Sequence, residues 1–187
     1  MRNLVVVAFV EPVSEGMEFA RDEWPLHITL VRFDVDGGVS GDEGVSADDV
    51  DGGAAPPGVA APQNDVLAAR VARLMEVPVR AALGTTVTAG APAGFGRNGS
   101  IPVTLIEPNA ALQQLHEELA DVAEGLRGRV ATPAYTRTGY RPHVSHQGEK
   151  TLRSGDSLRL DRIALVDMAP GGSHATRRIV TLWDATL

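Results

Sequence analysis

Cysteine is absent from this sequence, which excludes disulfides, thiolate metal sites and a cysteine nucleophile. Aromatic residues make up only 4% of the chain, so few rings could stack on the bases of a long single strand, and a small ligand is favoured. No apolar run reaches the length of about 18 residues that a membrane-spanning helix needs. The first apolar run stops at Glu11 with no small-residue cleavage site after it, which favours a strand over a signal peptide. We therefore expect a cytoplasmic protein that does not bind membranes.

Size and composition are those of an ordinary globular domain. The chain has 187 residues, of which 43% are hydrophobic and 22% charged, and this suits one compact unit. The net charge of −7 argues against duplex DNA as a partner, because phosphate binding depends on Lys and Arg. Seven acidic residues and no basic residue lie between Asp34 and Pro62, and they account for the whole net charge. Basic residues elsewhere remain available for a local patch that suits a small phosphate ligand: Arg97, Arg137, Arg141, Lys150, Arg153, Arg177 and Arg178.

Apolar periodicity predicts a chain of alternating strands and helices. Residues 36–62 are rich in Gly, Asp, Ala and Pro and have no apolar period, so we expect a flexible acidic insertion there. The clearest helix starts at Asn109, where leucines follow at three- and four-residue steps. The expected elements are strands over 4–10, 26–33, 79–89, 101–106, 142–147, 158–167 and 178–184, and helices over 14–22, from 64 or 65 to just before Pro78, and over 109–128.

The connections between several of these strands are too short for parallel crossovers. We therefore predict an α+β fold with antiparallel sheets. The order of the elements also suggests two similar halves, each with one histidine-bearing strand.

Two short segments match each other in those halves. They read PLHIT over 25–29 and PHVS over 142–145. Each has a proline, then a histidine, an aliphatic residue and a hydroxyl residue. Because alternate side chains of a strand share a face, His27 and Thr29 point one way, as do His143 and Ser145. One copy would be a weak signal, but the repetition indicates a site.

Two H-x-[ST] motifs in a chain of this length resemble the 2H phosphoesterase superfamily, and HITLVRF is similar to its RNA 2′-5′ ligase and cyclic phosphodiesterase branch. The resemblance implies a single bilobed domain over 1–187, internally duplicated, with two antiparallel sheets facing a central cleft and helices outside. It implies hydrolysis of 2′,3′-cyclic or 2′-5′ phosphodiesters, without metal or cofactor, by a phosphoric diester hydrolase that could run in reverse as an RNA 2′-5′ ligase. We expect a monomer acting on a small nucleotide or an RNA end.

The resemblance assigns catalysis to His27, Thr29, His143 and Ser145. Imidazole titrates near neutrality, so one histidine can act as base and the other as acid. The near-symmetry of the motifs leaves the assignment open, although we favour His27 as acid and His143 as base. The hydroxyls of Thr29 and Ser145 can donate to the non-bridging phosphate oxygens.

Further residues near the motifs are candidates for substrate binding. They are Arg32, five residues after His27, and Tyr140 and Arg141, just before the second motif. The second motif departs from the family pattern, because His146 follows the hydroxyl residue and the next basic residue is Lys150. On a regular strand His146 faces away from His143, which indicates packing rather than catalysis.

Other histidines and other functions fit less well. His116 lies on the predicted helix among glutamates, which favours a solvated or half-buried side chain, and His174 lies in a loop. A nucleotide or RNA-end binding module without turnover is the main alternative function. A structural protein with two coincidental strand patterns is a third.

Overall fold

The computed structural model describes residues 1–36 and 63–185. Within these residues the chain forms two α-helices, ten strands and four short 3₁₀ turns. The helices are α1 (Gln63–Ala82) and α2 (Ala110–Gly125). The strands are β1 (Arg2–Phe9), β2 (Glu18–Ala20), β3 (His27–Val35), β4 (Thr86–Phe95), β5 (Ile101–Ile106), β6 (Arg129–Val130), β7 (His143–Ser145), β8 (Ser157–Arg159), β9 (Arg162–Asp167) and β10 (Thr176–Asp184). The expected insertion at 36–62 lies, except for Asp36, outside the described residues.

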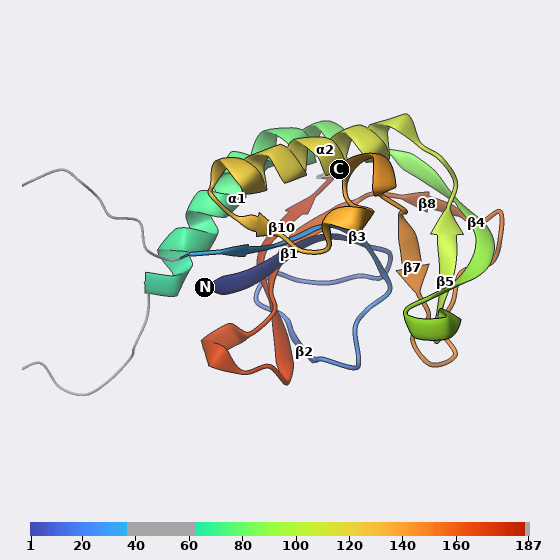
Figure 1. The fold of residues 1–187 in the computed structure, drawn as a ribbon, viewed down its shortest axis with the longest axis horizontal. Coiled ribbons are helices and arrows are strands. Elements are labelled where there is room, and N and C mark those ends of the chain that lie inside the picture. The colour runs from blue at the N-terminus through green and yellow to red at the C-terminus, as the bar shows by residue number, and fades with distance from the viewer. Residues whose placement is uncertain (37–62, 186–187) are drawn as a thin grey trace, which may run out of the picture.

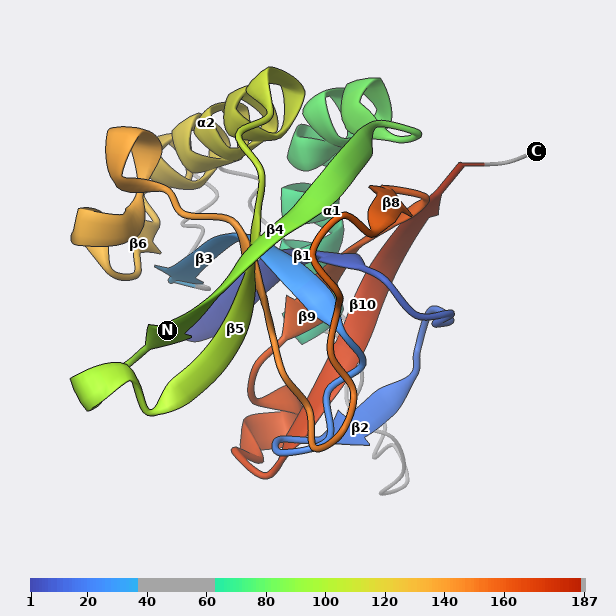
Figure 2. The same cartoon turned by 90° about the vertical axis from the view of Figure 1, so that its right-hand side faces the viewer.

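All pairs of neighbouring strands are antiparallel, and the fold is α+β as predicted. The strands follow one hydrogen-bonded path in the order β2-β10-β9-β1-β3-β7-β5-β4-β8, with β6 on the side of β3. Figure 2 shows β4 and β5 crossing in front of β1 and β3. The expected division into two sheets and the internal duplication are not confirmed, because β3 and β7 join the halves into one curled sheet.

Both helices cover the same face of the sheet (Figure 1). Alternation along β1 explains the two cores of the protein. Leu4, Val6 and Ala8 belong to the large cluster that includes the buried faces of α1 and α2. Val5 and Val7 point to the opposite face and join a smaller cluster. The second face is therefore free of helices, and it is the face on which the histidine of β3 lies.

Two sequence predictions about helices are wrong. Residues 14–22 form a turn and the short strand β2 instead of a helix, because Phe19 packs into the smaller core and β2 pairs with the edge of β10. Helix α1 continues through Pro78 to Ala82, where a proline was expected to end it. Val79 and Ala82 are both buried, so their packing offsets the backbone hydrogen bond that Pro78 removes. The predicted strand over 79–89 accordingly begins only at Thr86.

Helix α2 confirms the strongest helix prediction. The Asn109 side chain caps it by accepting a hydrogen bond from Leu112 N at 3.0 Å. Leu112, Leu115 and Leu119 are buried, as the three- and four-residue steps predicted. In the part of the chain that the structure describes, none of the helices has the length and hydropathy to cross a membrane.

Candidate active site

The two motifs lie on neighbouring strands. Ile28 of β3 pairs with Val144 of β7, and both side chains are fully buried toward the helices. Continuing the antiparallel register by one residue each way places Ser145 across from His27, and His143 across from Thr29. All four side chains therefore share the helix-free face, and each histidine has the hydroxyl of the other motif across from it.

Each histidine is held by the same local hydrogen bond. Nδ1 of His27 lies 2.8 Å from the carbonyl oxygen of Pro25, and Nδ1 of His143 lies 2.8 Å from that of Arg141. A carbonyl can only accept, so Nδ1 carries the proton in both neutral rings and Nε2 is left as the acceptor. Within residues 1–36 and 63–185, no hydrogen bond occupies either Nε2. Both motifs thus present the same ring nitrogen for chemistry.

The scarce aromatic residues are concentrated around these two rings. The His27 ring lies 4.5 Å from the ring of Trp24 and 5.9 Å from that of Phe9, between centroids. The His143 ring lies 4.3 Å from that of Phe95. Burial of the His27 ring, with a smaller contribution from charge on His143, lowers its pKa to about 4, although the hydrogen bond to Pro25 opposes the shift. Burial also lowers the pKa of His143, although its hydrogen bond to Arg141 opposes the shift.

A pocket of about 460 Å³ opens beside the motif strands. Thr29, His143 and Ser145 line it, while His27 lies on the same face of β3 but outside the lining. Among the described residues of the lining, Arg32 and Arg141 are cations and none is a carboxylate. The pocket therefore suits an anionic ligand next to the second motif.

The three predicted substrate-binding residues all line this pocket, but their side chains make different contacts. Arg141 lies over the Phe95 ring, 4.9 Å from its centroid, and Arg32 Nε donates to Asn3 at 3.2 Å. The Tyr140 hydroxyl donates to the carbonyl oxygen of Thr29 at 2.9 Å, and one face of its ring is stacked on His116. Tyr140 therefore has its hydroxyl committed to the protein.

Most of the residues that the sequence suggested for a basic patch do not line the pocket. Of the seven residues proposed for it, Arg141 alone lines the pocket. Arg137 pairs with acids of α2, and Lys150 pairs with Glu11 at 2.7 Å. The other oxygen of Glu11 accepts from Leu26 N at 2.6 Å, directly before His27. Lys150 thus ties the β7 side of the site to the start of β3.

Sequence reasoning did not select Phe95 or Trp24 for the site. Phe95 lies at the end of β4, in a glycine-rich turn whose motif carries no chemistry by itself. Trp24 directly precedes the proline of the first motif, and this position was the one available signal. Phe95 reaches His143 only through the fold, whereas Trp24 lies three residues before His27 in the sequence.

The remaining three histidines do not belong to the pair, although His116 lines the same pocket as His143. His146 faces the opposite side of β7, with Nε2 3.1 Å from Thr104 Oγ1, which agrees with the predicted packing role. His174 is exposed. His116 is only 1% exposed, so the expected solvated or half-buried histidine is wrong. Across the described residues, no cluster of three or more His, Asp or Glu side chains could hold a metal ion.

The lowered histidine pKa values predict how stability depends on pH. Burial lowers the pKa of His27, His116 and His143, so unfolding takes up protons below the unfolded-state pKa of about 6.5. Their contribution is complete above that pH and declines as pH falls toward the folded pKa values. We expect the free energy of unfolding in urea to fall between pH 6.5 and 5, by about 1.4 kcal/mol per pH unit for each proton taken up.

Two variants identify the groups responsible for this slope. His27→Gln should flatten the slope between pH 6.5 and 5. Glu11→Gln should leave it unchanged in this window, because the Lys150 and Leu26 hydrogen bonds lower the pKa of Glu11 despite its partial burial, and it titrates at more acidic pH. Stability that is constant between pH 7 and 5 would contradict the buried neutral histidines.

Comparison with known proteins shows a relationship at the level of structure. No family model and no curated protein matches the sequence. A crystal structure of a phosphoesterase covers 100% of this chain and 99% of its own, with a TM-score of 0.50 and 15% identity. The structure of E. coli LigT complexed with 3′-AMP gives the same coverage, TM-score and identity. The chain therefore has the fold of LigT and of the solved phosphoesterase, as its resemblance to the 2H phosphoesterase superfamily predicts.

Proposed function

We propose that this protein is a metal-independent 2H phosphodiesterase that opens 2′,3′-cyclic phosphates or 2′-5′ phosphodiester bonds by two-histidine acid–base catalysis. The substrate is a small nucleotide, a cyclic oligonucleotide or an RNA end. The fold it shares with LigT and a phosphoesterase supports this class of activity.

The pairing of β3 with β7 is the observation that carries the proposal. His27 and His143 are diagonal neighbours across this pair, and such residues lie about 7–8 Å apart, with their Cβ atoms somewhat closer. Both rings leave Nε2 open. A phosphate group between two such nitrogens would have a base on one side and an acid on the other, as in-line displacement requires.

The hydroxyls complete the site around the same phosphate. Thr29 and Ser145 lie on the same face, each across from the histidine of the other motif. They can donate to the two non-bridging oxygens, which keep negative charge through the transition state. Their strands are fixed in the sheet, so little reorganisation is needed when the charge shifts.

Burial lowers the pKa of both histidines, and the larger shift, that of His27, supports an assignment of the two roles. A histidine with a pKa of about 4 is neutral at pH 7, which is the form that takes a proton from water. We therefore assign the base to His27 and the acid to His143, the reverse of the order favoured from the sequence. A bound phosphodiester raises the pKa of both rings through its negative charge, which favours the protonated acid and strengthens the base. Proton transfer then runs from water to His27 and from His143 to the departing ribose oxygen.

The pocket beside the second motif supports a nucleotide as the rest of the substrate. Arg32 and Arg141 supply positive charge, and Phe95 and Tyr135 supply aromatic surface in the same lining. Rings of this kind stack on bases without strong preference for sequence. LigT has been solved with 3′-AMP, a ligand of the same chemical class.

Turnover of defined substrates in the presence of EDTA tests the proposal. We expect hydrolysis of 2′,3′-cyclic AMP or of a short 2′-5′ linked oligonucleotide, at a rate that added EDTA does not change. Binding of adenosine 2′- or 3′-monophosphate with no turnover of either substrate would instead support a nucleotide-binding module. Activity that is lost on chelation and restored by a divalent ion would overturn the acid–base mechanism.

A further inference from the structure

A third histidine connects the strands of the two motifs. His116 of α2 is buried, and its Nδ1 lies 2.6 Å from the carbonyl oxygen of Leu30 on β3. Its Nε2 lies 2.8 Å from the backbone nitrogen of Arg137, which belongs to the segment leading into β7. A carbonyl only accepts and an amide only donates. The ring must therefore be neutral, with its proton on Nδ1.

The same ring supports Tyr140, three residues before His143. The rings of His116 and Tyr140 are stacked in parallel, with centroids 3.9 Å apart and an interplanar angle of 3°. The Tyr140 hydroxyl donates to the carbonyl oxygen of Thr29. The next residue, Arg141, supplies the carbonyl that holds Nδ1 of His143. A short chain of contacts therefore runs from His116 to the hydrogen bond that orients the second catalytic ring.

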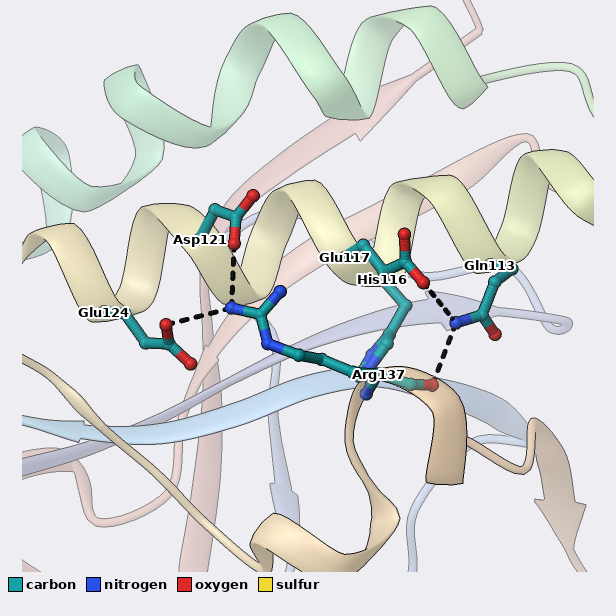
Figure 3. A network of polar contacts seen from close by, with 6 residues as sticks. All are labelled: Gln113, His116, Glu117, Asp121, Glu124 and Arg137. Carbon is teal, nitrogen blue, oxygen red and sulfur yellow. Dashed lines mark hydrogen bonds and ion pairs between the residues drawn. The ribbon is translucent and has the colours of Figure 1, made fainter.

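Helix α2 holds Arg137 in an unusual conformation. Arg137 has a φ of 56°, which costs energy for a residue with a Cβ. Figure 3 shows its side chain reaching along α2 to Asp121 and Glu124, at 2.8 and 2.9 Å. Gln113 Nε2 donates to its carbonyl oxygen at 2.9 Å. The Arg137 amide is thus aimed at His116 from a turn that is fixed on both sides.

We propose that His116 is a positioning residue for the phosphodiesterase site. Its imidazole is a brace that fixes β3, through Leu30, relative to the 137–141 segment, through Arg137 and Tyr140. Both of its ring nitrogens are bonded to the backbone, so it makes no proton transfer, although it belongs to the lining of the pocket. The inference rests on the proposed function for its effect on turnover, whereas the brace itself is a property of the fold.

Histidine suits this position because the brace needs one donor and one acceptor on a flat, rigid ring. An asparagine places its amide nitrogen near the position of Nδ1 and can keep only the bond to Leu30. A glutamine reaches the position of Nε2 and can keep only the bond to Arg137. A phenylalanine keeps the stacking on Tyr140 but loses both hydrogen bonds. These three substitutions separate the contacts.

Steady-state kinetics of the three variants test the proposal. We expect His116→Phe to lower kcat about tenfold or more with KM within about threefold, because small misplacements of reacting groups are costly. His116→Gln and His116→Asn should each lie between wild type and His116→Phe in kcat, because each keeps one of the two hydrogen bonds. The matched control is Leu119→Val, a buried substitution one turn along α2, which should lower stability but change kcat less than twofold. A wild-type kcat in His116→Phe, or a loss in Leu119→Val as large as in His116→Phe, would overturn it.

Amide hydrogen exchange tests the brace without turnover. The Arg137 amide should exchange at least about tenfold faster in His116→Phe than in wild type, and at the wild-type rate in Leu119→Val and in His116→Gln. Unchanged protection of this amide in His116→Phe would overturn the brace even if the enzyme is active. A protein with no activity but with this exchange pattern would refute the proposed function and leave the brace supported.

Discussion

Replacement of either catalytic histidine by alanine is expected to lower kcat on a 2′,3′-cyclic nucleotide at least about a hundredfold. Each ring makes one of the two proton transfers, and such transfers contribute about 10²- to 10⁴-fold. Because the two act on one transition state, the double variant should be little slower than the slower single variant. The measurement is kcat and KM for His27→Ala, His143→Ala and the double variant, with EDTA present.

Control variants separate this effect from general damage. His174 is exposed and lies outside the pocket lining, so His174→Ala should keep kcat within twofold of wild type. Circular dichroism and urea unfolding should show that the His27 and His143 variants remain folded. Turnover that is indifferent to both replacements would refute the paired mechanism, and it would move the active site elsewhere in the molecule.

Removal of the motif hydroxyls should give the second largest loss. We expect Thr29→Val and Ser145→Ala each to lower kcat about 10- to 100-fold with little change in KM, because the hydroxyls stabilise charge mainly in the transition state. Thr29→Ser keeps the hydroxyl and should recover most of the rate. The valine variant preserves the shape of threonine, so its loss reports the hydroxyl itself.

A matched substitution on another strand gives the baseline for this measurement. Ser157 of β8 is exposed and lies outside the pocket lining, so Ser157→Ala should leave kcat unchanged within twofold. Wild-type rates in both Thr29→Val and Ser145→Ala would show that the hydroxyls do not contact the phosphate. A rise in KM at constant kcat would assign them to ground-state binding instead.

Local patterns predicted the parts of the fold that depend on local physics. The apolar run at the N-terminus predicted β1, and the leucine spacing after Asn109 predicted α2. Alternation predicted that His27 and Thr29 share a face. The other elements depend on burial against segments that are distant in the sequence. Helix α1 continues past Pro78 because its last residues pack into the large core, and Phe19 lies on a strand because it packs into the smaller core.

The candidate site also divides into residues that a local sequence pattern predicts and residues that only tertiary contacts bring there. Repetition of a motif selected His27 and His143, because the chemistry needs particular residue types. Phe95, Glu11 and His116 carry no such signature, and they matter through contacts between residues far apart in the chain. His116 in particular lies among glutamates in the sequence, and it is buried because the 137–141 segment folds over it.

The backbone pairing of β3 with β7 sets the distance between the two motifs of the active site. Adjacent strands lie about 4.8 Å apart whatever the sequence between them, so the separation of the motifs is set by backbone hydrogen bonding. More than a hundred residues of chain connect the two strands, including the acidic, glycine-rich stretch after Asp36. The length of that stretch does not enter the catalytic spacing, which follows from the pairing of the two strands.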